Sequence, residues 1–69
     1  MNKALQYKVF CLESYKSVHN VSGSEALDIF NRYNVFTYLE RFYDMLHTTG
    51  RLYIVNDIDE YIAEQKAEG

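Results

Sequence analysis

The sequence predicts an all-α fold, a compact bundle of three to four helices that forms a single domain over residues 1–69. Three observations favour this fold. Several long segments repeat their apolar residues at intervals of three and four, which is the spacing of one helix face. The chain has no proline, and its three glycines are isolated from one another. Hydrophobic residues make up 48% of the sequence and aromatic residues 16%, which is enough apolar surface for the core of so short a chain.

The first helix is expected at about residues 2–18, where two neighbouring lines of apolar residues run along one side. The lines consist of Leu5, Val9 and Leu12, and of Ala4, Tyr7, Cys11, Tyr15 and Val18. Phe10 departs from this pattern, because it falls among polar residues. An isolated exposed aromatic side chain is ordinary. The alternative is that Phe10 docks a partner or a second copy of the chain.

The second helix is expected at about residues 23–33, and its start carries a specific signal. Residues 22–25 (SGSE) have the S-x-x-E form of a capping box. In that motif Ser22 accepts from the backbone N–H of Glu25, and Glu25 reaches back to Ser22. Asn34 ends the helix, since asparagine tolerates the left-handed backbone conformation. The joint is short, so we expect a tight corner between this helix and the next.

The third helix, expected at about residues 35–47, is the central one. Its apolar stripe consists of Val35, Leu39, Phe42 and Leu46. Flanking aromatic residues widen the stripe to about half of the helix circumference, so two or more other helices are needed to cover it. His47 follows the stripe at the C-terminal end, where the last carbonyl groups stabilise an imidazolium ion. This structural role for His47 is favoured over a functional one.

Residues 51–55 are ambiguous. Their β-branched and aromatic residues permit a strand, but the chain offers no second strand to pair with it. We expect an extended or one-turn connector there. Asn56 is then the cap of a last helix at about residues 57–66. Three carboxylates fall in the first turn of that helix, where the helix dipole favours negative charge: Asp57, Asp59 and Glu60.

The charge of the chain is unevenly distributed. The formal net charge is −3, and residues 1–50 carry five basic and five acidic side chains, so the whole deficit lies in residues 51–69. This is not the basic footprint of a nucleic-acid-binding protein. The chain has one cysteine, no apolar run near the ~20 residues of a membrane span, and polar residues that interrupt any signal peptide at its start. We therefore expect a cytoplasmic protein that does not contact a membrane.

The sequence shows no constellation for catalysis or cofactor binding. It has no glycine-rich phosphate loop, and Cys11, His19 and His47 lack the spacing of a zinc site or of a catalytic cysteine–histidine pair. We therefore expect no enzyme activity, no cofactor and no metal. The candidates for partner binding are Phe10, His47, Tyr53, Asp57, Asp59, Glu60 and Glu64. For the carboxylates, an ordinary solvated helix start is the simpler interpretation.

Several segments carry a resemblance to a known family. They are residues 9–15 (VFCLESY), 22–25 (SGSE), 30–35 (FNRYNV), 42–48 (FYDMLHT) and 53–62 (YIVNDIDEYI). Over about residues 5–63 the chain resembles domain-of-unknown-function family thirty-seven ninety-one, a group of small bacterial proteins found mostly in Firmicutes. Asn34 is a departure, because relatives often carry glycine there, but both residues suit the same turn. The resemblance implies no enzyme activity.

The resemblance also implies a genetic context. Such proteins are often encoded beside a second family that is similar to ADP-ribosyltransferases, so a small acidic helical protein in that position looks like an antitoxin or an accessory subunit. We therefore expect a protein-binding module whose carboxylates meet a basic surface, such as a nucleotide-binding cleft. One alternative is a helix-turn-helix DNA-binding regulator built around the corner at Asn34, although the exposed side of the following helix carries Glu40, Arg41 and Asp44. The other alternative is a purely structural homo-oligomer.

Overall fold

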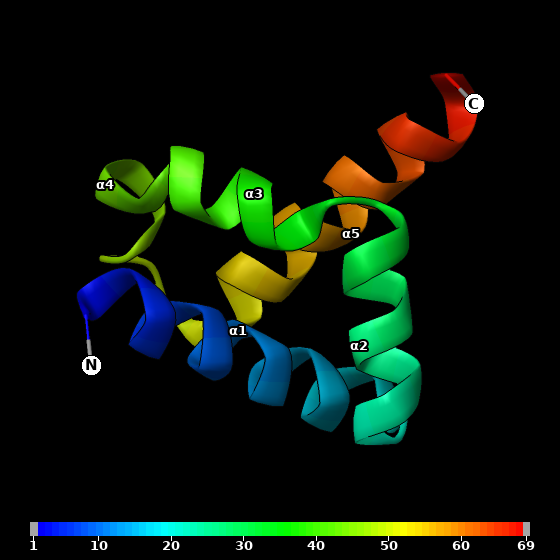
Figure 1. The fold of residues 1–69 in the computed structure, drawn as a ribbon, viewed down its shortest axis with the longest axis horizontal. Helices are drawn as coiled ribbons and strands as arrows, with labels where there is room; N and C mark the ends of the chain where they lie inside the picture. Colours follow the sequence, from blue (N-terminus) through cyan, green and yellow to red (C-terminus); the bar gives the residue numbers. More distant parts are fainter. Residues whose placement is uncertain (1, 69) are drawn as a thin grey trace.

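The computed structural model describes residues 2–68 and contains five helices and, within those residues, no strand (Figure 1). The helices are α1 (Lys3–His19), α2 (Gly23–Arg32), α3 (Val35–Arg41), α4 (Tyr43–Leu46) and α5 (Arg51–Glu68). None of them, in the part of the chain that is described, is long and apolar enough to cross a bilayer. The predicted all-α fold is confirmed. Two details differ: the helix expected at 35–47 is interrupted, and residues 51–55 are helical.

Local side-chain chemistry sets the boundaries of the first two helices. Asn2 caps α1 by accepting a hydrogen bond of 2.7 Å from the backbone N–H of Leu5, and Asn20 ends α1 in the left-handed conformation. Ser22 accepts from the backbone N–H of Glu25 at 3.1 Å, as the capping box predicts. The Glu25 carboxylate accepts from the Ser22 hydroxyl at 3.3 Å and so closes the box through the side chain.

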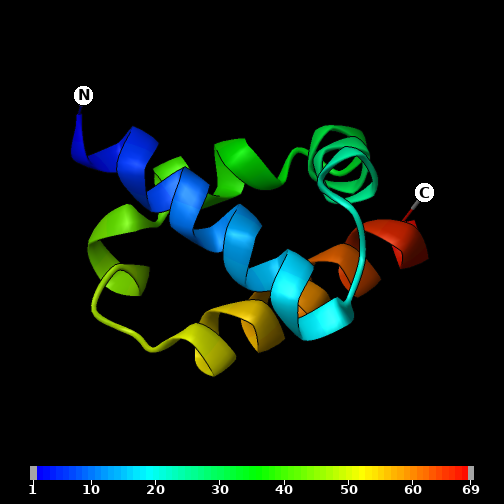
Figure 2. The same cartoon turned by 90° about the horizontal axis from the view of Figure 1, so that it is seen from below.

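Helix α1 packs against α5, α2 and α3, so the fold is assembled around it. In Figure 1, α1 and α3 lie one below the other, α2 joins them at one end, and α5 passes behind both. Figure 2 shows α5 as a layer on one side of the molecule. Asn34, in the left-handed conformation, makes the tight corner between α2 and α3. The largest fully buried side chains come from α1, α2, α3 and α5 and include Phe30, Leu39, Ile54 and Ile58.

The central helix predicted at 35–47 is interrupted at Phe42. This residue has φ −107° and ψ 22°, which lies outside the helical range, and it separates α3 from the single turn of α4. Phe42 is 38% exposed, whereas Leu46 is buried, so the straight apolar stripe is not formed. The interruption allows the Tyr43 ring to pack edge-on against Tyr7 of α1, with ring centroids 5.4 Å apart. Packing between helices therefore overrides the periodicity of a single helix.

Residues 51–55 form the first turns of α5, so the predicted connector is wrong. The backbone N–H of Ile54 donates to the carbonyl of Gly50 at 3.0 Å, as in a helix. The buried residues of α5 are Ile54, Val55, Ile58 and Ile62. They share one helix face, and their burial outweighs the preference of β-branched residues for strands. Asn56 consequently lies in the interior of α5 and is not a cap.

Candidate functional site

The outward side of α5 carries most of the residues predicted to bind a partner. Tyr53, Asp57, Glu60 and Glu64 follow one another at intervals of three and four, so they share one helix face. We call this surface, together with Asn56, the acidic face. Its carboxylates lie beyond the first turn of α5, which begins at Arg51, so the prediction that a helix N-terminus stabilises them is wrong.

A hollow of about 130 Å³ lies within the acidic face. It is lined by Tyr53, Asn56, Asp57 and Glu60, so the structure brings three of the predicted site residues together. The Tyr53 side chain is 61% exposed, which leaves its ring accessible at the edge of the hollow. Two carboxylates beside an aromatic ring suit the cationic end of a lysine or an arginine.

Asp57 is held in position from α3. The phenolic O–H of Tyr38 donates to Asp57 Oδ2 at 2.5 Å, and the Tyr38 ring stacks on Tyr61 with centroids 4.2 Å apart. Burial, the bond to Asp57 and the nearby negative charges raise the pKa of Tyr38 well above its usual range. The phenol therefore keeps its proton and remains a donor at physiological pH. Asp57 both fastens α5 to α3 and contributes charge to the hollow.

Asp59 lies away from the acidic face and joins two helices. His19 Nε2 is 2.9 Å and 3.0 Å from the two carboxylate oxygens of Asp59. The His19 ring also packs on Tyr15, with ring centroids 4.3 Å apart. The contact ties the C-terminal end of α1 to the middle of α5 across 40 residues of sequence. It leaves no periodic trace in the sequence, so it was not predicted.

His47 and Phe10 also lie apart from the acidic face, and both have aromatic neighbours. His47 Nδ1 is 2.8 Å from the carbonyl oxygen of Tyr43; because a carbonyl only accepts, Nδ1 carries the proton and donates. The two rings are parallel, with centroids 4.5 Å apart. Phe10 is 40% exposed and stacks on Tyr7 at 6.2 Å. These contacts support a structural role for His47 and place Phe10 at the margin of the core.

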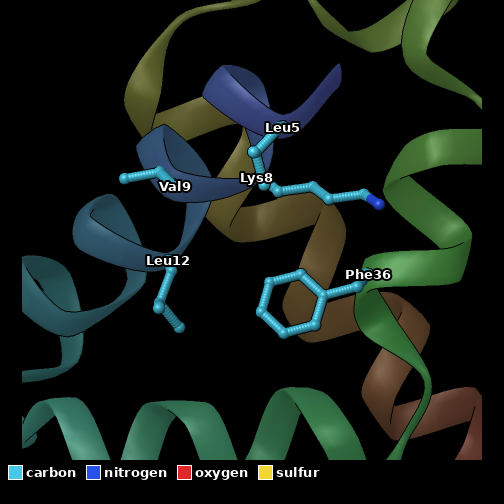
Figure 3. Close-up of a pocket in the computed structure, with 5 residues that line it drawn as sticks. All are labelled: Leu5, Lys8, Val9, Leu12 and Phe36. Atoms are coloured by element: carbon cyan, nitrogen blue, oxygen red, sulfur yellow. The ribbon is translucent and has the colours of Figure 1, made fainter. Parts of the chain in front are cut away.

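An apolar hollow that the sequence did not indicate lies between α1 and α3 (Figure 3). It has a volume of about 320 Å³ and is lined by Leu5, Lys8, Val9, Leu12 and Phe36. We call it the α1–α3 groove. The periodicity of the sequence assigns the line of Leu5, Val9 and Leu12 to the buried side of a helix. In the structure the buried residues of α1 include Tyr7, Cys11 and Tyr15, which belong to the second apolar line. The line of Leu5, Val9 and Leu12 borders the groove instead.

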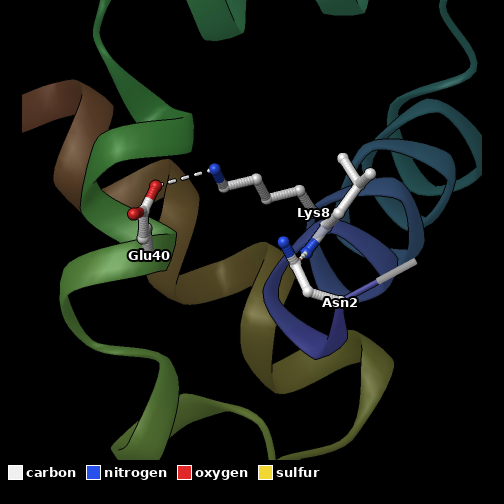
Figure 4. A network of polar contacts seen from close by, with 4 residues as sticks. Asn2, Lys8 and Glu40 are labelled. Atoms are coloured by element: carbon white, nitrogen blue, oxygen red, sulfur yellow. Dashed lines mark hydrogen bonds and ion pairs between the residues drawn. The ribbon is translucent and has the colours of Figure 1, made fainter.

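One rim of the α1–α3 groove is formed by an ion pair. The Lys8 side chain reaches toward α3, and its ammonium group lies 2.8 Å from Glu40 Oε2 (Figures 3 and 4). The aliphatic stem of Lys8 lines the groove while its charge stays at the edge. The hydrogen bond and the positive charge of Lys8 lower the pKa of Glu40. Phe36 packs edge-on against the buried Phe30 at 5.2 Å, which fixes the opposite wall.

The remaining side chains that could take part in chemistry are the Cys11 thiol and the residue types that bind metal ions. Cys11 is fully buried, and burial raises the pKa of its thiol to about 11. The thiol therefore stays protonated at neutral pH. Because only the thiolate is a good nucleophile, Cys11 is a poor nucleophile in the folded chain. Among residues 2–68, no three histidine, cysteine, aspartate or glutamate side chains gather closely enough to hold a metal ion. The acidic face offers negative charge to a partner, and the α1–α3 groove offers apolar contact.

Comparison with known proteins agrees with the resemblance seen in the sequence segments. A family model described as "Protein of unknown function (DUF3791)" matches residues 6–65, nearly the whole chain. No protein with a curated description and no solved structure matches.

Proposed function

The chain belongs to the DUF3791 family, and from this premise we propose that it is a cytoplasmic protein-binding module whose acidic face docks on a basic surface of another protein. The finer form of the proposal names the partner as an ADP-ribosyltransferase-like protein encoded nearby. The chain would then be its antitoxin or its accessory subunit. This finer form rests on the genetic context associated with the family and not on any single residue.

The acidic face supports the proposal because its negative charge is not neutralised within the described chain. The ion pairs found among residues 2–68 use the carboxylates of Glu13, Asp28, Glu40 and Asp59. Glu60 and Glu64 take part in none of these pairs, and Asp57 is held by the neutral phenol of Tyr38. A patch of uncompensated charge favours an oppositely charged partner and speeds the encounter with it.

Tyr53 adds an anchor to this charged surface. An exposed tyrosine beside a hollow buries a large ring area on binding and loses little conformational entropy, and such residues dominate the energetics of many interfaces. A cleft that binds a nucleotide directs positive charge at the phosphate groups. An acidic helix that occupies such a cleft takes the place of those phosphates, which is a direct way to neutralise a nucleotide-dependent enzyme.

The DNA-binding alternative has weaker support. The corner between α2 and α3 has the required tightness. The exposed side of α3, however, presents Thr37, Glu40 and Arg41, and Glu40 is engaged by Lys8. Contacts from basic side chains to phosphates supply most of the affinity for DNA. No observation therefore favours this alternative over protein binding.

The proposal is tested by titration calorimetry against the protein encoded by the neighbouring gene. The variants to compare are wild type and the double variant Glu60→Lys with Glu64→Lys, whose side chains are exposed and whose fold is expected to be retained. We expect each reversal to weaken binding roughly tenfold, and added salt to weaken wild-type binding. Glu13→Lys makes the same charge change as one of these two reversals, but on α1, and is the control, expected to bind like wild type.

Two results would contradict the proposal in different ways. Absence of wild-type binding at micromolar concentration excludes the role of antitoxin or accessory subunit for that protein. Equal weakening by the double variant and by Glu13→Lys excludes the acidic face as the docking surface.

A further inference from the structure

We propose that the α1–α3 groove is the interface of a homodimer, in which it meets the same groove of a second copy of this chain. The proposal does not depend on a partner at the acidic face. Leu5 and Val9, on the outer edge of the groove, are 45% and 51% exposed although both belong to an apolar line of α1. Contact with another apolar surface removes them from water, which is favourable.

The shape of the groove suits a two-fold interface. Such an interface needs a projecting part and a recess side by side on one surface, because each copy makes the same contacts as the other. Figure 3 shows Val9 at the outer edge of α1, and beside it the recess bounded by Leu12 and Phe36. Val9 of each copy therefore has a recess to enter in the other. Phe36 is already fixed by Phe30, so little conformational freedom is lost on association.

The charge distribution favours a second copy over a charged partner at this surface. The charged side chains along the groove side of α1 are paired within the chain, Lys8 with Glu40 at 2.8 Å and Lys16 with Glu13 at 3.0 Å. This surface is therefore close to neutral, whereas the net charge of −3 arises in residues 51–69. Helix α5 lies behind α1 and α3 in Figure 1, and in Figure 3 its ribbon lies behind the side chains that line the groove. Two copies that meet groove to groove hold their acidic faces apart, which keeps like-charge repulsion small.

The accessible surface of the chain leaves room for a dimer of modest affinity. It measures 4714 Å², and a standard-size interface buries about 800 Å² per partner, or roughly one sixth of it. The α1–α3 groove and its rim form only part of one face, so we expect a small interface and a dissociation constant on the order of 100 µM.

Sedimentation equilibrium of the full chain between about 10 µM and 1 mM tests the proposal. The wild-type mass is expected to rise from 8.2 kDa toward twice that value. Leu5→Glu is expected to stay at the monomer mass, because each dimer would bury two unpaired carboxylates. Leu52→Glu makes the same change in the first turn of α5, where the side chain is 73% exposed and lies outside the groove, and it is expected to dimerise like wild type.

Dilution followed by NMR locates the interface. The backbone amide signals of Leu5, Val9 and Phe36 are expected to move with concentration, and those of Tyr53 and Glu60 to stay fixed. Val9→Glu, judged by the same sedimentation experiment, replaces Leu5→Glu if circular dichroism shows that the latter is unfolded. A wild-type chain that is monomeric at 1 mM overturns the proposal. So does a folded groove variant that dimerises like wild type, or a set of moving signals confined to the acidic face.

Discussion

The buried polar residues differ in how well their hydrogen-bonding groups are satisfied. The Tyr38 phenol has a carboxylate partner at 2.5 Å. Ser14, on the core side of α1, is 1% exposed, and its hydroxyl has no hydrogen-bond partner among residues 2–68. A buried hydroxyl without a partner is less stable than a methyl group in the same place. Ser14 is therefore a weak point of α1.

Replacement of Ser14 tests this interpretation. Ser14→Ala is expected to raise the free energy of unfolding by about 1 kcal/mol, because it removes the unpaired hydroxyl and improves helix propensity. In a chain of this length, the gain corresponds to a rise in Tm of roughly 4–8 °C, which a thermal melt followed by circular dichroism detects. Ser17→Ala, at an exposed position of the same helix, gains propensity alone and should change Tm much less. A lower Tm for Ser14→Ala would show that the hydroxyl is satisfied in solution.

Among the elements, α5 differs most from the prediction, and its starting point matters for the core. Gly50 leads directly into the helix, and Ile54 and Val55 are buried by its first turns. If the helix began at residue 57, these two side chains would not share a face with Ile58. The core therefore depends on an unbroken helix through Asn56.

Proline substitutions distinguish a helix that begins at 51 from one that begins at 57. Asn56→Pro is expected to destabilise the fold by about 3 kcal/mol or more, because proline in a helix interior removes a hydrogen bond and clashes with the preceding turn. Arg51→Pro is the control, since the first position of a helix tolerates proline, and it should be nearly neutral. Urea titrations of the two variants give the comparison. Similar stabilities for both would mean that residues 51–55 are not helical in solution.

Features that depend on interactions within a few residues are visible in the sequence, whereas features that depend on contacts between helices are not. The starts of α1 and α2 depend on side chains within three residues, such as Ser22 and Glu25, and the capping box at α2 is visible in the sequence. The break at Phe42 accompanies a contact between Tyr43 and Tyr7 of another helix, which no local pattern encodes. The same holds for the surfaces. The carboxylates of the acidic face belong to one helix and are candidates from the sequence alone, although the sequence places Tyr53 in a connector and groups Asp59 with them. The α1–α3 groove needs two helices and is not visible in the sequence.

For the molecule as a whole, four side chains keep their protons to a higher pH in the folded state than in the unfolded state. Burial is the main cause that raises the pKa values of Tyr7, Tyr15 and Tyr38 above 10.0 and that of Cys11 from 9.0 to about 11. In the unfolded chain the same groups lose their protons at the ordinary, lower values. The unfolded state therefore binds fewer protons than the folded state above about pH 9, and stability falls as the pH rises.

An alkaline titration measures this linkage. The contribution of these groups to the free energy of unfolding is expected to be constant below about pH 9 and to decline from there to about pH 12. Urea titrations at a series of fixed pH values give the profile. Tyr38→Phe removes one of the groups, so its decline should be shallower than that of wild type. A profile that is flat between pH 9 and 12 would contradict the burial of these side chains.

The place of α5 in the chain order also has a consequence during translation. Its 18 residues emerge from the ribosome after the helices that they cover. At about 5–20 residues per second, the nascent chain waits roughly 1–4 s with α1 to α4 made and α5 still absent. Tyr38 lacks its partners during that interval, because both Asp57, which accepts its hydrogen bond, and Tyr61, on which its ring stacks, belong to α5. The contacts that join α3 to α5 therefore form only after α1 to α4 have been made.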